Sequence, residues 1–230
     1  MPPTTRIARA ASVFVLAAWA AAGAFAASVT PGGGPVALPG TTALANPALG
    51  GPIIADVVTH WVSADDPQYG FPGAEGSLQS RVVRETGTGT LDFYWRVTVD
   101  GPSYPGYVPV GLGLSSLPLD RFLTGASYDA DYRLDGTGGS APAAAVAPDA
   151  TSLTWQFDAS LGPGGSTYFL FLHSNATAYD ESAFAALGVS TFQTFAPTAA
   201  VPEPGEAALL LAGLLGCGAL FRRRHRSRAD

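Results

Sequence analysis

Histidine and aspartate are the residues of this chain whose chemistry can go beyond packing, because both bind metals and both transfer protons. His60 and His173 are the two histidines between the basic ends of the chain, and they lie near Trp61 and Phe171 in apolar runs. A zinc site built on two histidines needs a further ligand close by, and the sequence spacing supplies none. We therefore interpret both as packed or surface histidines, and we expect no metal site and no cofactor.

Asp129, Asp131 and Asp135 lie in the sequence DADYRLDG, which has a faint similarity to a calcium-binding loop. In an EF-hand loop the third ligand comes two residues after the second, a glycine follows, and a glutamate closes the loop. Here the third aspartate comes four residues after the second, and the closing glutamate is missing. We interpret the segment as a solvated strand and turn. Binding of calcium at the protein surface stays open as an alternative.

The chain carries no motif of a known catalytic machinery. It has no G-x-S-x-G turn, no H-E-x-x-H helix and no Gly-rich loop between a strand and a helix. We therefore expect that it is not an enzyme. Two alternatives stay open: a secreted hydrolase that uses a carboxylate pair, and a glycan-binding module. In the glycan-binding alternative, the sugar would bind to an exposed aromatic face made of Trp61, Tyr69, Phe71, Tyr94, Tyr104 and Tyr107.

Charge is scarce and unevenly distributed along the 230 residues. Charged residues make up 13% of the chain and hydrophobic residues 47%, whereas a typical soluble domain is about 25% charged. Residues 27–203 hold five arginines against sixteen carboxylates, a net charge of about −11. Such an acidic middle region excludes nucleic acid as a partner, because phosphate binding needs clustered cations.

Alternation of apolar and polar residues predicts an all-β domain over residues 52–197. In residues 91–99 the side chains of Leu91, Phe93, Trp95, Val97 and Val99 fall on one face, which is typical of a half-buried strand. Further strands are expected at 53–63, 77–85, 107–114, 127–134, 153–158, 166–175 and 189–196, separated by Gly/Pro/Asp turns. About eight strands indicate an antiparallel β-sandwich. A short helix is expected at 180–187, and a Gly/Pro-rich linker or arm at 27–51.

The first 26 residues have the pattern of a secretory signal peptide. Two arginines are followed by an apolar run of about a dozen residues, and Ala24 and Ala26 supply the small residues of a cleavage site. Cleavage is expected between Ala26 and Ala27. The pattern therefore predicts export through Sec-type machinery and a signal peptidase.

The last thirty residues combine three features in a fixed order. A Val201-Pro202-Glu203-Pro204-Gly205 motif precedes an apolar run at about 206–221, which has the character of a single transmembrane helix. A basic tail follows at 222–228, and its positive charge places it in the cytoplasm. The tail contains Arg222, Arg223, Arg224, Arg226 and Arg228.

In this order, and together with the signal peptide, residues 198–230 resemble the PEP-CTERM sorting signal of exported bacterial proteins. The resemblance implies that an exosortase, a membrane-embedded protease, recognises Pro202, Glu203 and Pro204 and cleaves near them. It also implies a membrane-anchored precursor in contact with lipid, with the β domain outside the inner membrane. The mature form would then be at the cell surface or extracellular, and linked to exopolysaccharide or a biofilm matrix.

Overall fold

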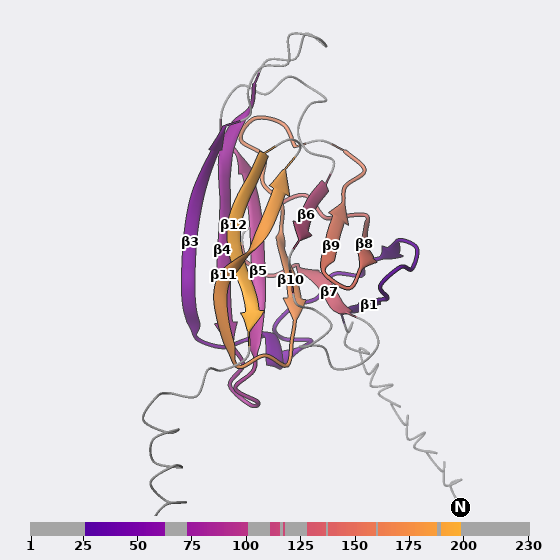
Figure 1. The fold of residues 1–230 in the computed structure, drawn as a ribbon, viewed down its shortest axis with the longest axis vertical. Helices are drawn as coiled ribbons and strands as arrows, with labels where there is room; N and C mark the ends of the chain where they lie inside the picture. Colours follow the sequence, from indigo (N-terminus) through magenta and orange to yellow (C-terminus); the bar gives the residue numbers. More distant parts are fainter. Residues whose placement is uncertain are drawn as a thin grey trace, which may run out of the picture.

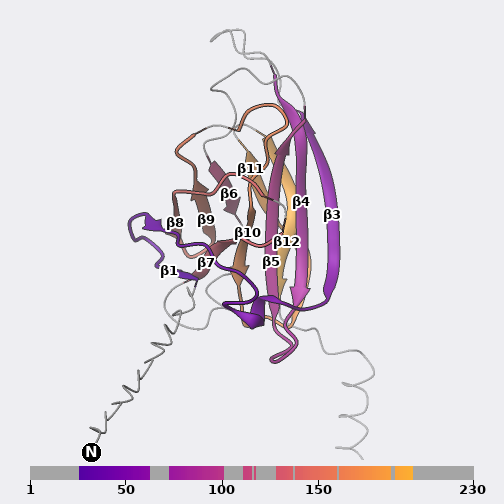
Figure 2. The same ribbon diagram turned by 180° about the vertical axis from the view of Figure 1, so that it is seen from behind.

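The computed structural model describes residues 26–62, 73–100, 111–115, 117, 128–136, 138–159, 161–187 and 190–198. Within them the chain forms two antiparallel sheets of six strands each. Figures 1 and 2, which view the molecule from opposite sides, show the sheets as two facing layers. The expectation of an all-β antiparallel sandwich is therefore confirmed.

The first sheet has the strand order β1-β7-β10-β5-β4-β3. Its strands span Ala27–Val29 (β1), Tyr128–Arg133 (β7), Phe169–His173 (β10), Leu91–Val99 (β5), Glu75–Arg84 (β4) and Ile53–Val62 (β3). The second sheet has the order β12-β11-β6-β9-β8-β2. Its strands span Ser190–Thr198 (β12), Ala178–Leu187 (β11), Gly111–Ser115 (β6), Ser152–Gln156 (β9), Ala144–Asp149 (β8) and Val36–Ala37 (β2).

The expected number of strands, about eight, is too low, because β1, β2, β8 and β11 were not predicted. β1 and β2 are very short and lie in the Gly/Pro-rich segment 27–51, which also contains a 3-10 helix, η1 (Pro47–Leu49). β1 pairs with β7 in the first sheet and β2 pairs with β8 in the second. This segment is therefore an arm that contributes a strand to each sheet.

The helix expected at 180–187 is wrong, because these residues belong to strand β11. Ala183, Ala185 and Leu187 are buried at a spacing of two, and the strand pairs with β12 on one side and β6 on the other. Alanine favours a helix in isolation, but its small side chain also fits between packed sheets. Pairing on both sides outweighs the local preference.

Strand β5 places its predicted apolar face in the core between the sheets. Its five residues on that face are at most 2% exposed. The ring centroids of Trp95 and Trp155, on facing sheets, lie 5.7 Å apart. Trp95 Nε1 also donates a hydrogen bond to Thr194 Oγ1 on β12, at 2.7 Å. The core therefore contains both apolar packing and a polar link between the sheets.

The opposite face of β5 is also largely covered. Tyr94 packs in a second apolar cluster with Leu49, Val83 and Phe171, and its hydroxyl donates to the Leu49 carbonyl oxygen at 3.2 Å. The arm around η1 therefore covers part of the outer face of the first sheet, and β5 is more buried than a half-buried strand.

No helix among the described residues is long and apolar enough to span a membrane. The expected transmembrane helix at about 206–221 and nearly all of the expected signal peptide lie outside the described residues.

Candidate functional site

Polar side chains form a row across the outer face of the first sheet. His173 on β10 lies opposite Asp92 on β5 and opposite Asp129 on β7. Asp129 in turn lies opposite Ser28 on β1. Residues directly opposite each other in antiparallel strands point to the same face. The strand register therefore brings together side chains that are far apart in the sequence, and we call these four residues the histidine row.

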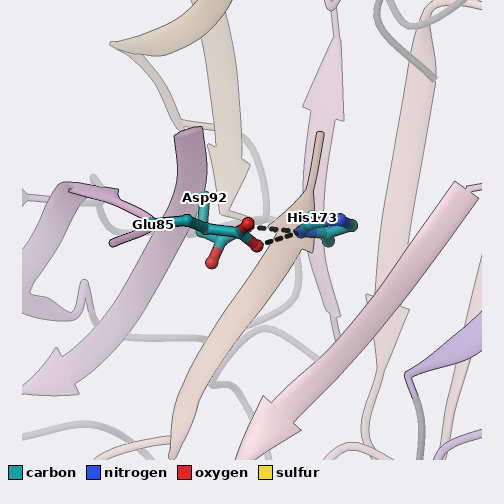
Figure 3. Close-up of side chains that lie close together, drawn as sticks. All are labelled: Glu85, Asp92 and His173. Atoms are coloured by element: carbon teal, nitrogen blue, oxygen red, sulfur yellow. Dashed lines mark hydrogen bonds and ion pairs between the residues drawn. The ribbon is translucent and has the colours of Figure 1, made fainter. Parts of the chain in front are cut away.

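Glu85, directly after β4, extends this row into a compact cluster with Asp92 and His173 (Figure 3). His173 Nδ1 lies 2.7 Å from Asp92 Oδ1 and 3.1 Å from Glu85 Oε1. Figure 3 shows this ring nitrogen turned toward both carboxylates, with the second nitrogen on the far side of the ring. The cluster therefore offers two carboxylate oxygens and one imidazole nitrogen to a common point.

The two carboxylates of the cluster are removed from solvent. Asp92 is 0% and Glu85 3% exposed, whereas the His173 side chain is 27% exposed. Burial raises the pKa of Asp92 to about 6, although the hydrogen bond with His173 acts in the opposite direction. That hydrogen bond raises the pKa of His173 above its ordinary value. The pKa values of both groups therefore lie above their ordinary values, for Asp92 because of burial and for His173 because of its hydrogen bond with Asp92.

Two threonines fix the orientation of Glu85. Thr90 Oγ1 donates to Glu85 Oε2 at 3.1 Å, and the Thr88 hydroxyl donates to the same oxygen. The backbone N–H of Glu85 donates to the Thr90 carbonyl oxygen at 2.9 Å. The tight turn after β4 therefore leaves the other oxygen, Oε1, directed at His173.

A second polar feature, which we call the arginine groove, lies on the same sheet face. It is a hollow of about 570 Å³ whose lining includes Arg81, Arg96, Arg133, Tyr94 and Phe169. Three of the five arginines in residues 27–203 thus line one hollow of an acidic domain. A guanidinium beside an aromatic ring is suited to bind carboxylate groups on a flat ligand.

The charges in the arginine groove are partly neutralised. Arg81 Nη2 lies 2.8 Å from Asp56 Oδ2, and Arg133 is paired with Asp135. Arg96 donates only to backbone carbonyl oxygens in the described structure, those of Thr167 at 3.2 Å and Gly138 at 3.4 Å. Its guanidinium carbon lies 5.9 Å from the centroid of the Phe169 ring. Arg96 therefore carries the positive charge of the groove that no described carboxylate balances.

The three aspartates of the DADYRLDG segment do not form a calcium loop. Asp129 belongs to the histidine row, and Asp135 pairs with Arg133. Asp131 is 0% exposed, so the expectation of a solvated strand was wrong at this residue. Its Oδ1 accepts hydrogen bonds from the backbone N–H groups of Gly40 and Tyr132, each at 2.9 Å. Burial nevertheless raises the pKa of Asp131 to about 6.

Two candidates for an aromatic sugar-binding face are buried. Trp61 and Tyr94 are each 3% exposed, so neither presents its ring to solvent. The other four candidates, Tyr69, Phe71, Tyr104 and Tyr107, lie outside the described residues. His60 is exposed on the edge strand β3, as expected.

The predicted processing residues fall at or beyond the limits of the described structure. Ala24, the motif at 201–205 and the arginines at 222–228 lie outside it. Ala26 packs against the cluster around Phe171, and Ala27 begins β1 opposite Ala130. The predicted cleavage position, between Ala26 and Ala27, therefore lies immediately before the first strand.

Sequence reasoning missed the cluster of Glu85, Asp92 and His173. The only local signal was Asp92, a charged residue in a strand with a fully apolar inner face, and nothing in the sequence linked it to a histidine 81 positions later. Comparison with protein-family models, curated proteins and solved structures found no match. The function is therefore argued from the residues and the geometry alone.

Proposed function

We propose that this chain is an exported bacterial surface protein that is sorted and processed through its C-terminal segment. The signal-peptide pattern, the Val-Pro-Glu-Pro-Gly motif, the apolar run and the arginine tail support this together. A folded acidic β domain between them is the part that would be delivered. The observation on which the proposal rests is the order of these elements at the C-terminus, which resembles the PEP-CTERM signal.

Each part of the C-terminal segment has a physical role in this proposal. Pro202 and Pro204 keep the backbone extended, because proline disfavours a helix at its own position and at the preceding residue. The apolar run holds the motif at the outer face of the membrane, and the arginines fix its orientation. An exosortase would then reach an accessible backbone at a fixed height. Replacing the three motif residues by alanine tests the proposal, because the variant should be exported but not processed.

We propose no catalytic role for the β domain. Glu85 and Asp92 are the two carboxylates in the cluster described above, and they are 3% and 0% exposed. A hydrolase needs both carboxyl groups open to the scissile bond of its substrate. A sugar chain has no access to this pair, so this pair gives the hydrolase alternative no support.

A second candidate function, a binding module for acidic glycans, is favoured by the arginine groove. Uronate sugars present a carboxylate beside a ring with an apolar face, and the groove offers Arg96 and the ring of Phe169 to such a unit. A surface protein linked to exopolysaccharide would use such a contact to stay in the matrix. This candidate recognises the sugar through Arg96 and Phe169, and it does not use the buried rings of Trp61 and Tyr94.

Replacing Arg96 by glutamine should weaken binding to a polyuronate such as alginate by about tenfold, because one charge-assisted contact is lost. Arg84 is the matched control, since its Nη1 donates to the Gly89 carbonyl oxygen and it does not line the groove. Isothermal titration of both variants at low salt measures the effect. Equal losses in Arg96→Gln and Arg84→Gln, or no binding by the unchanged protein, would contradict this candidate.

A further inference from the structure

Glu85, Asp92 and His173 have the composition of a metal site. Their ligand atoms all lie within 4.8 Å of one another. They come from three separate parts of the first sheet: the turn after β4, strand β5 and the end of β10. Two carboxylates and an imidazole are ligand types that divalent transition metals accept together. The residue types alone are compatible with a bound metal ion. The stronger evidence is the environment of the carboxylate oxygen atoms.

Two buried carboxylate oxygens in the cluster lack hydrogen-bond partners among the described residues. They are Asp92 Oδ2 and Glu85 Oε1. A buried carboxylate oxygen without a partner is costly, because it has lost water and gained nothing in return. His173 Nδ1 faces both carboxylates and carries at most one proton, so it cannot donate to both in full. The cluster therefore holds more negative charge and more acceptor capacity than the histidine can satisfy.

A divalent cation would balance the charges of the cluster. With both carboxylates ionised and the imidazole neutral, the three groups carry a charge of −2 in total. Protonating His173 leaves one negative charge unbalanced on two carboxylates that are almost fully buried. A doubly charged ion bound by Asp92, Glu85 and His173 Nδ1 leaves none. Such an ion would also bind Glu85 Oε1, the buried oxygen that faces the His173 ring and has no hydrogen bond.

Hydrogen bonds from neighbouring side chains fix the orientation of Glu85. Thr88 and Thr90 donate to Glu85 Oε2, which leaves Oε1 turned toward His173. In a tetrahedral zinc site the ligand atoms lie roughly 3.3 Å apart, given bond lengths of about 2.0–2.1 Å. The separations here, 2.7 and 3.1 Å, are slightly shorter. The third separation, between the two carboxylate oxygens, is no more than 4.8 Å, so adjustment of the side chains would bring all three ligand atoms around one ion.

Solvent reaches the cluster from the histidine side. His173 lines an open hollow of about 380 Å³ together with Ser28, Asn46 and Asp129. Asp129 contributes to raising the pKa of His173, so it acts on the ring from the neighbouring strand. The ion therefore has a path of entry, and water from the hollow can complete its coordination.

We propose that Glu85, Asp92 and His173 bind one divalent transition-metal ion, of which Zn²⁺ is the probe. The nitrogen ligand separates this assignment from calcium and magnesium, which prefer oxygen ligands throughout. The ion joins the turn after β4 to β5 and β10, so its binding stabilises the folded domain. This inference is independent of the sorting function and of the arginine groove.

The test uses the full chain, treated with a chelator, exchanged into chelator-free buffer and titrated with Zn²⁺ by calorimetry. Cys217 and His225 in the C-terminal segment have side chains of the types that ligate zinc, so the site is defined by comparing variants. The number of Zn²⁺ ions bound per chain should be higher by one in the unchanged protein than in the His173→Ala variant. At this site the variant should lose affinity by about 100-fold or more. His60→Ala removes the exposed histidine of β3 and should bind as the unchanged protein does.

A second variant and a second measurement separate metal binding from folding. Glu85→Gln keeps the size of the side chain and its threonine contacts but removes the charge, so it should retain the near-UV circular dichroism and lose the zinc. Zn²⁺ should raise the unfolding temperature of the unchanged protein and of His60→Ala, and leave that of Glu85→Gln unchanged. Equal zinc uptake by all variants, or an equal rise with Ca²⁺, would overturn the proposal.

Discussion

A variant with alanine at Pro202, Glu203 and Pro204 is expected to accumulate in the membrane fraction with its C-terminal segment uncut. Two physical changes lead to this result. The acidic side chain that a protease would recognise is lost, and alanine allows the helix to extend through the former motif. Under the sorting proposal, the backbone at the outer face would then be hydrogen-bonded within a helix and closed to the protease. Cell fractionation in the native host, followed by mass spectrometry of the membrane-bound form, measures the effect.

The matched control for this variant is Glu206→Gln. Glu206 is the acidic residue directly after the motif, at the start of the apolar run. Because it lies outside the motif, its neutralisation should leave processing intact. The sorting account fails if the triple-alanine protein matures as the unchanged protein does, since the motif would then have no role in processing.

Replacing Trp95 by alanine should lower the free energy of unfolding by about 3–5 kcal/mol. Trp95 is 1% exposed, packs on Trp155 of the facing sheet and donates a hydrogen bond to Thr194. The change opens a cavity between the sheets and removes a polar link across them. Since domains are stable by only about 5–15 kcal/mol, the loss is a large part of the total. Urea unfolding of the purified protein measures it.

Two further variants define the origin of that loss. Val62, on the edge strand β3, is 72% exposed, so Val62→Ala should change the stability by less than about 0.5 kcal/mol. Trp95→Phe keeps most of the apolar volume and loses the hydrogen bond to Thr194, so its cost should be intermediate. If Trp95→Ala unfolds at the same urea concentration as Val62→Ala, then Trp95 does not lie in the core between the sheets.

The strands with clear alternation were predictable because one face of each is fully buried against the other sheet. β5 is the best example, since its five apolar residues predicted both its limits and its inward face. β11 was mistaken for a helix, because Ala183 and Ala185 favour a helix locally and only pairing with two neighbours makes them a strand. β1 and β2 lie in a Gly/Pro-rich segment that has little intrinsic preference for a strand.

The cluster of Glu85, Asp92 and His173 could not be predicted because it depends on strand register. Asp92 and His173 meet only because β10 pairs with β5 in one particular alignment, and a shift by one residue would turn one of them to the other face. The arginine groove has the same origin, since Arg81, Arg96 and Arg133 come from three strands. Sequence patterns predict the individual strands, whereas these sites depend on the register between paired strands.

The intact mass of the protein recovered from the surface and the medium of its native host tests the central proposal most directly. That value, read with the masses of the terminal peptides from a digest of the same sample, fixes both ends of the mature chain. The account predicts a chain that begins at Ala27 and ends within or next to residues 201–205, with any attached group appearing as added mass. A mature protein that still carries the apolar run and the arginines at 222–228 would contradict it.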